Sequence, residues 1–504
     1  MNALLSRLFL RYLRPGRALG VLAVVGALSA CAVGPDYEKP VVAVGQTYKE
    51  VQGWTIAQPG DDRIRGDWWR LFDDATLNQL MDALQASNLS VAQAEAQYRQ
   101  AQATVNSAQS GFFPNISTAA SATRSGAGSG SSSGIQLGGG SNNPSNQFSL
   151  SGSVSWEPDV WGRVRRTVEA SQANLQASAA DIASTRLSMQ STLAQTYFRL
   201  RALDAEKRLL QETVAAYERS LSMTQNRFAA GVAAQADVAV SRTQLENTRT
   251  QLLALDWQRA QFEHAIAVLM GQAPSGFDLA TRQTVGEVPP IPLALPSQLL
   301  ERRPDVAASE RRTTAANAQI GVAQAAWFPD LTLSAQGGFR SGQWAQWLTA
   351  PYNFWSLGPA LALTVFDGGA RRAQVDQARA AYDAQVAEYR LTVLTALREV
   401  EDYLVLLRVL GEEQTTQGRA LASARESLRL TQNQYEAGLI DYLSVVQVET
   451  TALSTERAAI SLMADRLVAS VQLIAALGGG WQAGQPVEPV QTPQAPTASP
   501  TGRP

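Results

Sequence analysis

Two long stretches of the chain carry apolar residues at every third or fourth position, separated by Gln, Ser, Thr and Ala. In the first stretch, apolar residues recur seven positions apart, at Val168, Leu175, Ile182 and Met189. In the second, steps of three and four residues run from Tyr382 to Leu407. Such spacing predicts helices that each have one packed seam. We expect long helices at about 162–226 and 369–433, the second interrupted near Gly411, and partner helices at about 235–270 and 441–477.

Four shorter segments instead alternate apolar and small polar residues. They predict strands at about 115–124, 147–157, 330–340 and 355–366. About ten residues with one apolar face is the pattern of an outer-membrane β-strand. Aromatic residues stand near the strand ends, where membrane-interface girdles lie: Trp156, Phe339, Trp355 and Phe366. A soluble antiparallel sheet with one face on a core is the alternative interpretation.

The helix and strand pattern occurs twice. Phe112-Phe113-Pro114-Asn115-Ile116 returns as Trp327-Phe328-Pro329-Asp330-Leu331, and Phe228-Ala229-Ala230-Gly231-Val232 as Tyr435-Glu436-Ala437-Gly438-Leu439. We therefore predict two structural repeats, residues 74–275 and 290–480. The first copy is longer by eight residues, because the offset between the copies falls from 215 to 207. The extra length lies where the first copy has a Gly- and Ser-rich tract, Ser125 to Asn146, which is typical of a flexible loop.

Four strands cannot close into a barrel, and an open sheet edge cannot face lipid. Two chains would give eight strands and a barrel filled by side chains, whereas three would give twelve and leave a channel. The predicted fold is thus α+β, with four membrane-spanning strands per chain that close into a barrel by oligomerisation and with long helices that pack side by side.

Composition excludes several classes of function. The 504 residues hold 42 basic and 44 acidic side chains, so nothing favours binding to nucleic acid. With one His and one Cys, the chain cannot build a Cys/His metal cluster. His264 falls on a predicted apolar seam, where we expect it to be packed. We predict no enzyme activity, no metal and no cofactor apart from covalently attached acyl chains.

The first thirty residues have the composition of a targeting signal. Four arginines precede an apolar stretch from Ala18 to Leu28, and small residues lead into Cys31. This pattern predicts a lipoprotein signal peptide over residues 1–30, with lipidation of Cys31 by diacylglycerol and an N-acyl chain such as palmitate. Residues 31–73 would form an N-terminal anchor segment, and the Pro-rich residues 482–504 a disordered tail.

Several short motifs, taken in order, resemble those of the outer-membrane efflux factors, the TolC/OprM-like superfamily, and its NodT-type lipoprotein branch. The resemblance covers about residues 31–481 and rests on Cys31-Ala32-Val33-Gly34-Pro35-Asp36-Tyr37, Trp68-Trp69, Arg303-Pro304-Asp305-Val306 and Leu477-Gly478-Gly479-Gly480-Trp481. It implies a trimeric twelve-stranded transmembrane β-barrel in the outer membrane, with four strands per chain, continued by a long periplasmic α-helical barrel. It also implies that this homotrimer docks to a periplasmic adaptor (membrane fusion) protein and to an inner-membrane pump of the RND type.

The resemblance also implies which residues act at the periplasmic tip. The turns between the long helices would engage the adaptor, through Arg227 and Gly231 in the first repeat and Gln434 and Gly438 in the second. The family pattern has Arg where Gln434 stands, so equal docking at the two turns is in doubt. Glycine at both turns is also what a helix end requires.

Asp441, and less strongly Asp237, would form a periplasmic gate. Three copies of each around a threefold axis make an acidic ring, which can set cation preference. The alternative for both residues is a helix cap.

The leading function is therefore a passive exit duct of a tripartite multidrug or solute efflux system. The chain would be lipid-anchored on the periplasmic side of the outer membrane and extend into the periplasm. Alternatives are an exit duct for protein secretion and a lipid-anchored periplasmic coiled coil without a pore. A cell-wall hydrolase is more distant. The exported substrate does not follow from the sequence.

Overall fold

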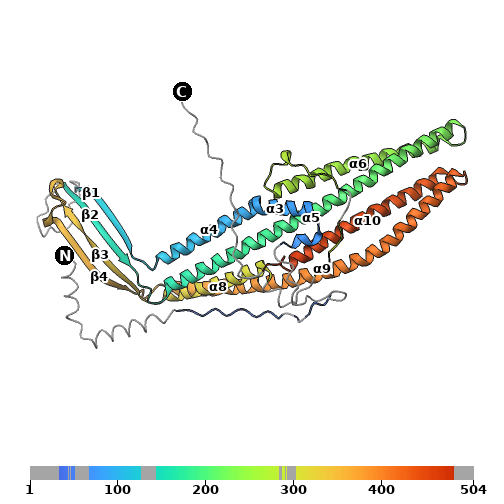
Figure 1. Ribbon diagram of the computed structural model, residues 1–504. Helices are drawn as coiled ribbons and strands as arrows, with labels where there is room; N and C mark the ends of the chain where they lie inside the picture. The colour runs from blue at the N-terminus through green and yellow to red at the C-terminus, as the bar shows by residue number, and fades with distance from the viewer. Residues whose placement is uncertain are drawn as a thin grey trace, which may run out of the picture. The chain divides into compact units, whose positions relative to one another are not determined.

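The computed structural model describes residues 33–43, 45, 47–50, 67–126, 144–282, 286–289, 291 and 302–481 (Figure 1). Helices dominate, and four strands form the only sheet within these ranges. The elements follow in this order: η1 (Trp68–Phe72), α3 (Ala75–Ser87), α4 (Leu89–Ser110), β1 (Asn115–Ser125), β2 (Ser145–Trp156), α5 (Arg163–Ala229), α6 (Gln235–Leu269), η2 (Pro274–Gly276), α8 (Pro304–Ala325), β3 (Asp330–Ser341), η3 (Trp344–Gln346), η4 (Ala350–Tyr352), β4 (Asn353–Ala362), α9 (Ala370–Glu436) and α10 (Tyr442–Ala476).

The two halves of the described chain contain the same series of elements. Helices α4 and α8 have 22 residues each, α5 and α9 have 67 each, and α6 and α10 have 35 each. A pair of strands follows the 22-residue helix in both halves. Each half thus runs helix, strand, strand, long helix, turn, helix.

The sheet has the strand order β1-β2-β3-β4, and every neighbouring pair is antiparallel. The prediction of a strand continuing to residue 366 is wrong. Asp330, the first residue of β3, pairs with Ala362, so the ladder has no partner for Leu363 to Phe366. A strand ends where its neighbour can no longer supply hydrogen-bonding groups.

The predicted interruption near Gly411 is also wrong, because α9 is one continuous helix. A single glycine inside a helix costs about 1 kcal/mol relative to alanine. Leu407 and Leu410 are buried just before Gly411, and the helix continues beyond it to Glu436 without a break.

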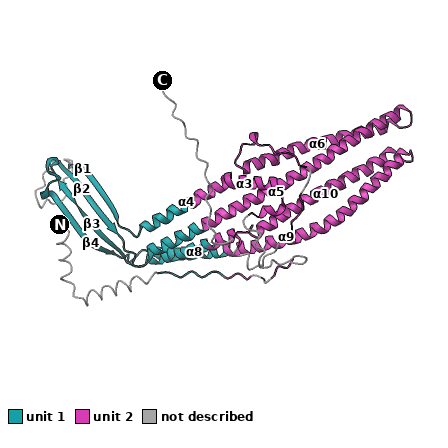
Figure 2. Cartoon of the chain, viewed as in Figure 1, with its two compact units in different colours: residues 1–40, 100–176, 311–387 teal, residues 41–99, 177–310, 388–504 magenta. Residues whose placement is uncertain are grey.

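The described chain divides into two compact units (Figure 2). Unit 2 consists of residues 41–99, 177–310 and 388–504 and holds the main apolar core. Its largest fully buried side chains are Trp68, Trp69, Tyr197, Tyr389 and Phe198. Helix α10 is long and apolar enough to cross a membrane by length and composition, but 44% of that window is buried, and Leu467, Val471 and Ile474 pack in this core. We interpret α10 as a core helix.

Unit 1 consists of residues 1–40, 100–176 and 311–387 and contains the sheet. Its helical segments pack through small residues, with Ala170, Ala173, Ala315 and Ala318 all buried. Gly34, at a φ of +115°, lies so close to Gly321 that a Cβ on Gly34 would meet the Cα of Gly321 at 2.5 Å. Residues 33–37 therefore lie against α8, where a larger side chain would separate them.

Candidate functional site

The two turns between the long helices have the same backbone geometry. After α5, Gly231 has a φ of +75°, and the Val232 amide donates to the Arg227 carbonyl at 2.9 Å. After α9, Gly438 also has a φ of +75°, and the Leu439 amide donates to the Gln434 carbonyl at 2.9 Å. These are Schellman ends, in which glycine takes the left-handed position. Both predicted docking glycines thus have a structural role in closing a helix.

Arg227 and Gln434 occupy the same place in the two turns but differ in their contacts. The Arg227 guanidinium lies 4.6 Å from the centre of the Tyr435 ring and donates to the Tyr435 carbonyl at 3.2 Å. The Arg227 side chain therefore connects the end of α5 with the end of α9. The Gln434 side chain is exposed. The two turns consequently present different side chains to any partner.

The two acidic residues at the tips act as helix caps. Asp441 is the N-cap of α10, and its Oδ1 accepts from the Ser444 amide at 3.0 Å and from the Ser444 hydroxyl at 2.6 Å. The Ser444 hydroxyl, followed by the amide, lowers the pKa of Asp441. Asp237 lies in the first turn of α6 and accepts from the Ala234 amide at 3.1 Å. Both carboxylates are thus placed where a helix N-terminus favours negative charge.

The sheet has one hydroxyl-rich face and one apolar face. On the hydroxyl face, serine pairs cross from β1 to β2, Ser117 with Ser153 at 2.8 Å and Ser121 with Ser149 at 2.7 Å. The apolar face includes exposed Ile116, Trp355, Leu357 and Leu361. A two-faced sheet with an uncovered apolar face is suited to lie between lipid and water.

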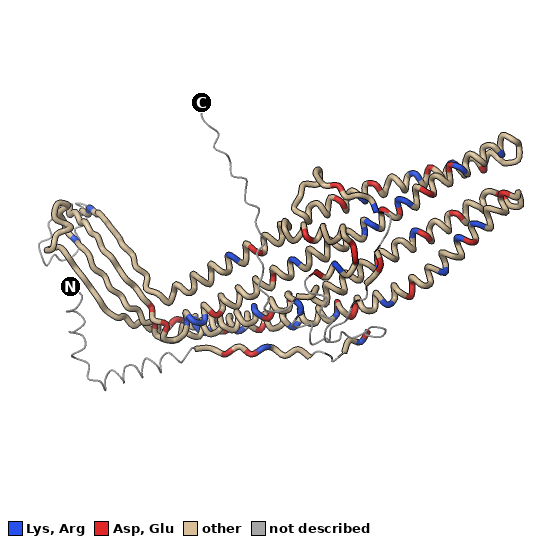
Figure 3. The backbone as a smooth tube through the Cα atoms, in the orientation of Figure 1, with Lys and Arg blue, Asp and Glu red and all other residues tan. Residues whose placement is uncertain are grey.

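Charge is nearly absent from the four strands, as Figure 3 shows. The charged residues of the strands are Arg124, Asp330 and Arg340; Asp330 is the first residue of β3, and the two arginines each precede the last residue of their strand. The long helices, in contrast, carry many charged residues. β1 and β4 are the two edges of the sheet, and each has one side unpaired.

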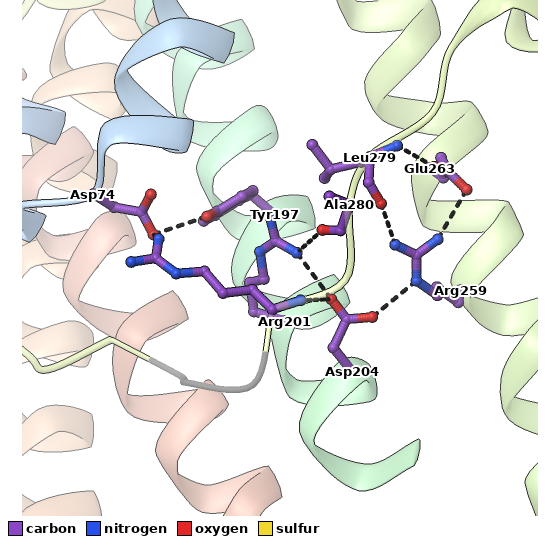
Figure 4. A network of polar contacts seen from close by, with 9 residues as sticks. Asp74, Tyr197, Arg201, Asp204, Arg259, Glu263, Leu279 and Ala280 are labelled. Carbon is purple, nitrogen blue, oxygen red and sulfur yellow. Dashed lines mark hydrogen bonds and ion pairs between the residues drawn. The ribbon is translucent and has the colours of Figure 1, made fainter. Parts of the chain in front are cut away.

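Helices α5 and α6 hold a network of ionic contacts, which fixes the segment after α6 (Figure 4). Asp204 accepts from Arg201 at 2.9 Å and from Arg259 at 2.8 Å, and its side chain is 1% exposed. Arg201 also donates to the Ala280 carbonyl at 2.7 Å, and Arg259 to the Leu279 carbonyl. These contacts pair the Asp204 carboxylate with two guanidinium groups and hold Leu279 and Ala280 by their carbonyls, so the network stabilises the fold.

The family model for "Outer membrane efflux protein" matches this chain at residues 80–272 and again at 295–479. These two matches cover most of the chain. The chain belongs to the outer membrane efflux protein family.

Relatives and solved structures of the family match almost the whole chain. The toluene efflux pump outer membrane protein TtgC of Pseudomonas putida is 29% identical over 465 residues, 91% of this chain and 95% of that protein. The cation efflux system protein CusC of Escherichia coli is 28% identical over 460 residues, 90% of this chain and 97% of that protein. The structure of the outer-membrane channel OprN matches with a TM-score of 0.81 and 30% identity, covering 90% of this chain and all of that one.

Two of the motifs that indicated this family fold into the core of unit 2. The Arg303 guanidinium donates to Asp305 at 2.6 Å, to Glu399 of α9 at 2.7 Å and to the Ala476 carbonyl at the end of α10 at 3.2 Å. The Trp68 and Trp69 rings meet edge to face, with centroids 6.0 Å apart, and both are fully buried. In this member of the outer membrane efflux protein family, both motifs hold helices together.

The motif that follows Cys31 is held by unit 1. The Arg166 guanidinium donates to the Val33 carbonyl at 3.2 Å and to Asp36 at 3.3 Å, and the Asn317 amide donates to the Pro35 carbonyl at 3.0 Å. Cys31 itself, and with it the predicted signal peptide, lies outside the described residues. So do the predicted tail, residues 482–504, and most of the Gly- and Ser-rich tract.

The prediction that His264 is packed on an apolar seam is wrong, and the burial of Glu449 was not predicted. His264 is exposed on α6, although the corresponding Val471 of α10 is fully buried. Glu449 was overlooked: it is 8% exposed and stands on the α10 seam with Tyr442, Val445 and Ala452. A carboxylate at an apolar seam position is the signal that could have identified it. Among the described residues, no group of three or more His, Cys, Asp or Glu could hold a metal ion.

Proposed function

We propose that three copies of this chain form the outer-membrane exit duct of a tripartite efflux system, through which substrates pass without an energy source in the duct itself. The observation that carries the proposal is the two-faced, four-stranded sheet with two unpaired edges. Such a sheet cannot stand alone in a membrane, because its edge groups would lack hydrogen-bond partners. Closing with sheets from two further copies gives twelve strands, enough for a water-filled lumen.

The helices support lateral assembly of the same kind. Large apolar side chains are exposed on the single chain, among them Leu253 and Trp257 of α6 and Leu391 and Leu394 of α9. Contiguous exposed apolar residues mark surfaces that other proteins cover. Contact with neighbouring copies would bury them and join the long helices, built as two repeats, into a periplasmic tunnel.

The partners follow from the family and from the tip turns. We infer a periplasmic adaptor protein, seated on the turns at Gly231 and Gly438, and an inner-membrane pump of the RND type. The relatives are named for different exported substrates: TtgC for toluene and CusC for cations. The pump, rather than the duct, would therefore select what is exported.

Two experiments on purified protein test the duct. Heat-resistant oligomers on gels, with a cross-linked mass of three chains, and stepwise ion conductance in planar bilayers are the expected results. A monomer that does not conduct would support the alternative of a lipid-anchored coiled coil. If the duct conducts, but deleting its gene impairs protein secretion and leaves drug resistance unchanged, the secretion duct is the better interpretation.

A lipid anchor at Cys31 is part of the proposal. The segment from Val33 to Asp36 is fixed by Arg166, so acyl chains on Cys31 would start close to a fixed point of unit 1. Cys31→Ser is expected to abolish incorporation of radiolabelled palmitate, because this is the chain's only thiol. Incorporation equal to that of the wild type would show that the protein is not a lipoprotein of this kind.

Asp441 can be tested for gating separately from capping. Asparagine caps a helix about as well as aspartate but carries no charge. If Asp441 contributes to a gate, Asp441→Asn should lower cation selectivity in bilayers, while hydrogen exchange at residues 442–446 stays slow. Asp441→Ala should change both measurements. If cation selectivity is unchanged in both variants, Asp441 acts only as a helix cap. Asp256→Ala on α6 is the control for the loss of a remote charge.

A further inference from the structure

Glu449 is a buried carboxyl group at a position that the α10 seam otherwise fills with apolar and aromatic residues. It is 8% exposed and lies on the same seam as Tyr442, seven residues earlier, and Val445, four residues earlier. It lies in unit 2, in the part of α10 nearer the turn that contains Gly438. A buried carboxylate is costly unless it is paired or hydrogen-bonded.

The contacts of Glu449 do not compensate an ionised carboxylate. Its Oε1 accepts one hydrogen bond, from the Gln432 amide of α9 at 3.3 Å. Its Oε2 is buried and has no hydrogen-bond partner. A neutral carboxyl group costs less to bury than a carboxylate, because it carries no net charge.

Among the described residues, the groups that interact with Glu449 are neutral: Gln432, Tyr217 and Tyr442. Tyr217 of α5 and Tyr442 of α10 both have their pKa raised by burial first, with the charge of Glu449 contributing, and that of Tyr217 reaches about 12. From α6, Gln244 donates to the Tyr217 hydroxyl at 3.2 Å. Charged residues of the same stretch pair elsewhere: Arg249 with Glu218 and Glu246, Arg425 with Glu456, and Arg429 with Glu426. Burial accordingly raises the pKa of Glu449 above its ordinary value of 4.5.

Polar contacts around Glu449 join two helical hairpins, α5–α6 and α9–α10. The Ser220 hydroxyl of α5 donates to the Tyr442 hydroxyl at 3.0 Å, which in turn donates to the Ser241 hydroxyl of α6 at 3.2 Å. Gln244 of α6 also donates to the Thr450 hydroxyl of α10 at 3.3 Å. These bonds are between neutral groups and are individually weak. A charge appearing among them would favour separation of the hairpins, because separation lets water reach the carboxylate.

We propose that Glu449 is a proton-sensitive lock between the α5–α6 and α9–α10 hairpins. With the carboxyl group neutral, the hairpins pack as the structure shows; with the carboxylate ionised, the separated arrangement is favoured. For its effect on conduction, the proposal rests on the proposed function, since only a duct that is narrowed by these hairpins would widen as they part.

The direction of the pH dependence follows from linkage. The packed state binds the proton more tightly than the separated state, in which Glu449 has its ordinary pKa. Packing is therefore fully favoured below about pH 4.5, and this preference is lost as the pH rises through the raised pKa of the packed state. Each unit of difference between the two pKa values shifts the equilibrium about tenfold towards separation at high pH.

Hydrogen–deuterium exchange tests the lock without requiring a pore. In the wild-type oligomer, exchange of peptides covering 215–225 and 440–452, corrected for the intrinsic effect of pH, should rise about tenfold or more between about pH 5 and about pH 8. Glu449→Gln keeps the size and one acceptor but cannot ionise, so its exchange should stay at the acid level. Gln432→Met removes the only hydrogen bond that stabilises the carboxylate, so the midpoint should move to higher pH.

Bilayer conductance gives the second measurement. Wild-type conductance should increase with pH, that of Glu449→Gln should remain at the acid level, and the exposed control Glu413→Gln should follow the wild type. A Glu449→Gln protein with the wild-type pH profile in exchange would overturn the lock. Absence of conductance in every protein, with the exchange pattern as expected, would instead count against the duct and leave the lock standing.

Discussion

Replacing Asp204 by alanine is expected to cause the largest loss of stability of any single change in the helical network. Its carboxylate is 1% exposed and pairs with both Arg201, which is 3% exposed, and Arg259. Removing it leaves two cations with little access to water and no carboxylate between them. Breaking one member of a buried ion pair costs about 3–5 kcal/mol in the free energy of unfolding. The loss should appear as a lower urea midpoint of the helical circular dichroism signal.

The matched control is Asp256→Ala on the neighbouring helix. Asp256 pairs with Lys207 at 2.6 Å, but its side chain is 50% exposed, and exposed pairs contribute about 0–1 kcal/mol. A difference of several kcal/mol between the two variants is expected. Equal urea midpoints would mean that water already reaches Asp204, and that the segment at Leu279 and Ala280 is held by other contacts.

Substituting valine for Gly338 is expected to abolish formation of the sheet. A Cβ at Gly338 would overlap the carbonyl oxygen of Leu150 and the Cα of Ser151, both in the backbone of β2. Backbone atoms of a paired strand cannot move aside without breaking the ladder, so β2 and β3 would part and leave two separate hairpins. Two-stranded hairpins are marginal in isolation. Nearly complete loss of heat-resistant oligomers from outer-membrane fractions is therefore the expected result.

Gly152→Val provides the control within the same sheet. Gly152 pairs with Gly337, and a Cβ there would meet nothing within 4 Å. Its side chain would extend into open space without disturbing the ladder, and oligomers should form at the wild-type level. If both variants assemble equally, β2 and β3 are not paired in the register that brings Ser151 opposite Gly338.

The long helices were accessible from sequence because their seams are periodic and unbroken. The spacing from Val168 to Met189 requires only local geometry, and α5 begins at Arg163 and ends at Ala229, close to the expected 162–226. The end of β4 was not accessible, because it is decided by where β3 begins. A strand boundary is a property of the pair, and a single segment does not contain it.

The polar contacts could not be predicted from the sequence, for a related reason. Arg227 donates to the carbonyl of Tyr435, which is 208 positions away, and the choice of that partner depends on how two hairpins meet. The family motifs indicated that Arg303 and Trp68 are distinctive, but they did not predict the contacts of these side chains. Glu449 could have been found, because a carboxylate that interrupts an apolar seam is visible in the pattern itself. The prediction for His264 failed because α6 and α10 bury different faces, so alignment with Val471 of α10 did not indicate its burial.

The equal lengths of the paired helices have a consequence for symmetry. With 67 residues in both α5 and α9, and 35 in both α6 and α10, the two hairpins are of one length. A ring of three chains would then end in six turns at a common level, a rim with sixfold repetition made from a threefold assembly. Seven residues inserted into each helix of one hairpin alone would stagger the rim by roughly 10 Å. A partner ring with six identical subunits could contact all six turns. Because Arg227 and Gln434 alternate around the ring, the turns would still be of two chemically different kinds.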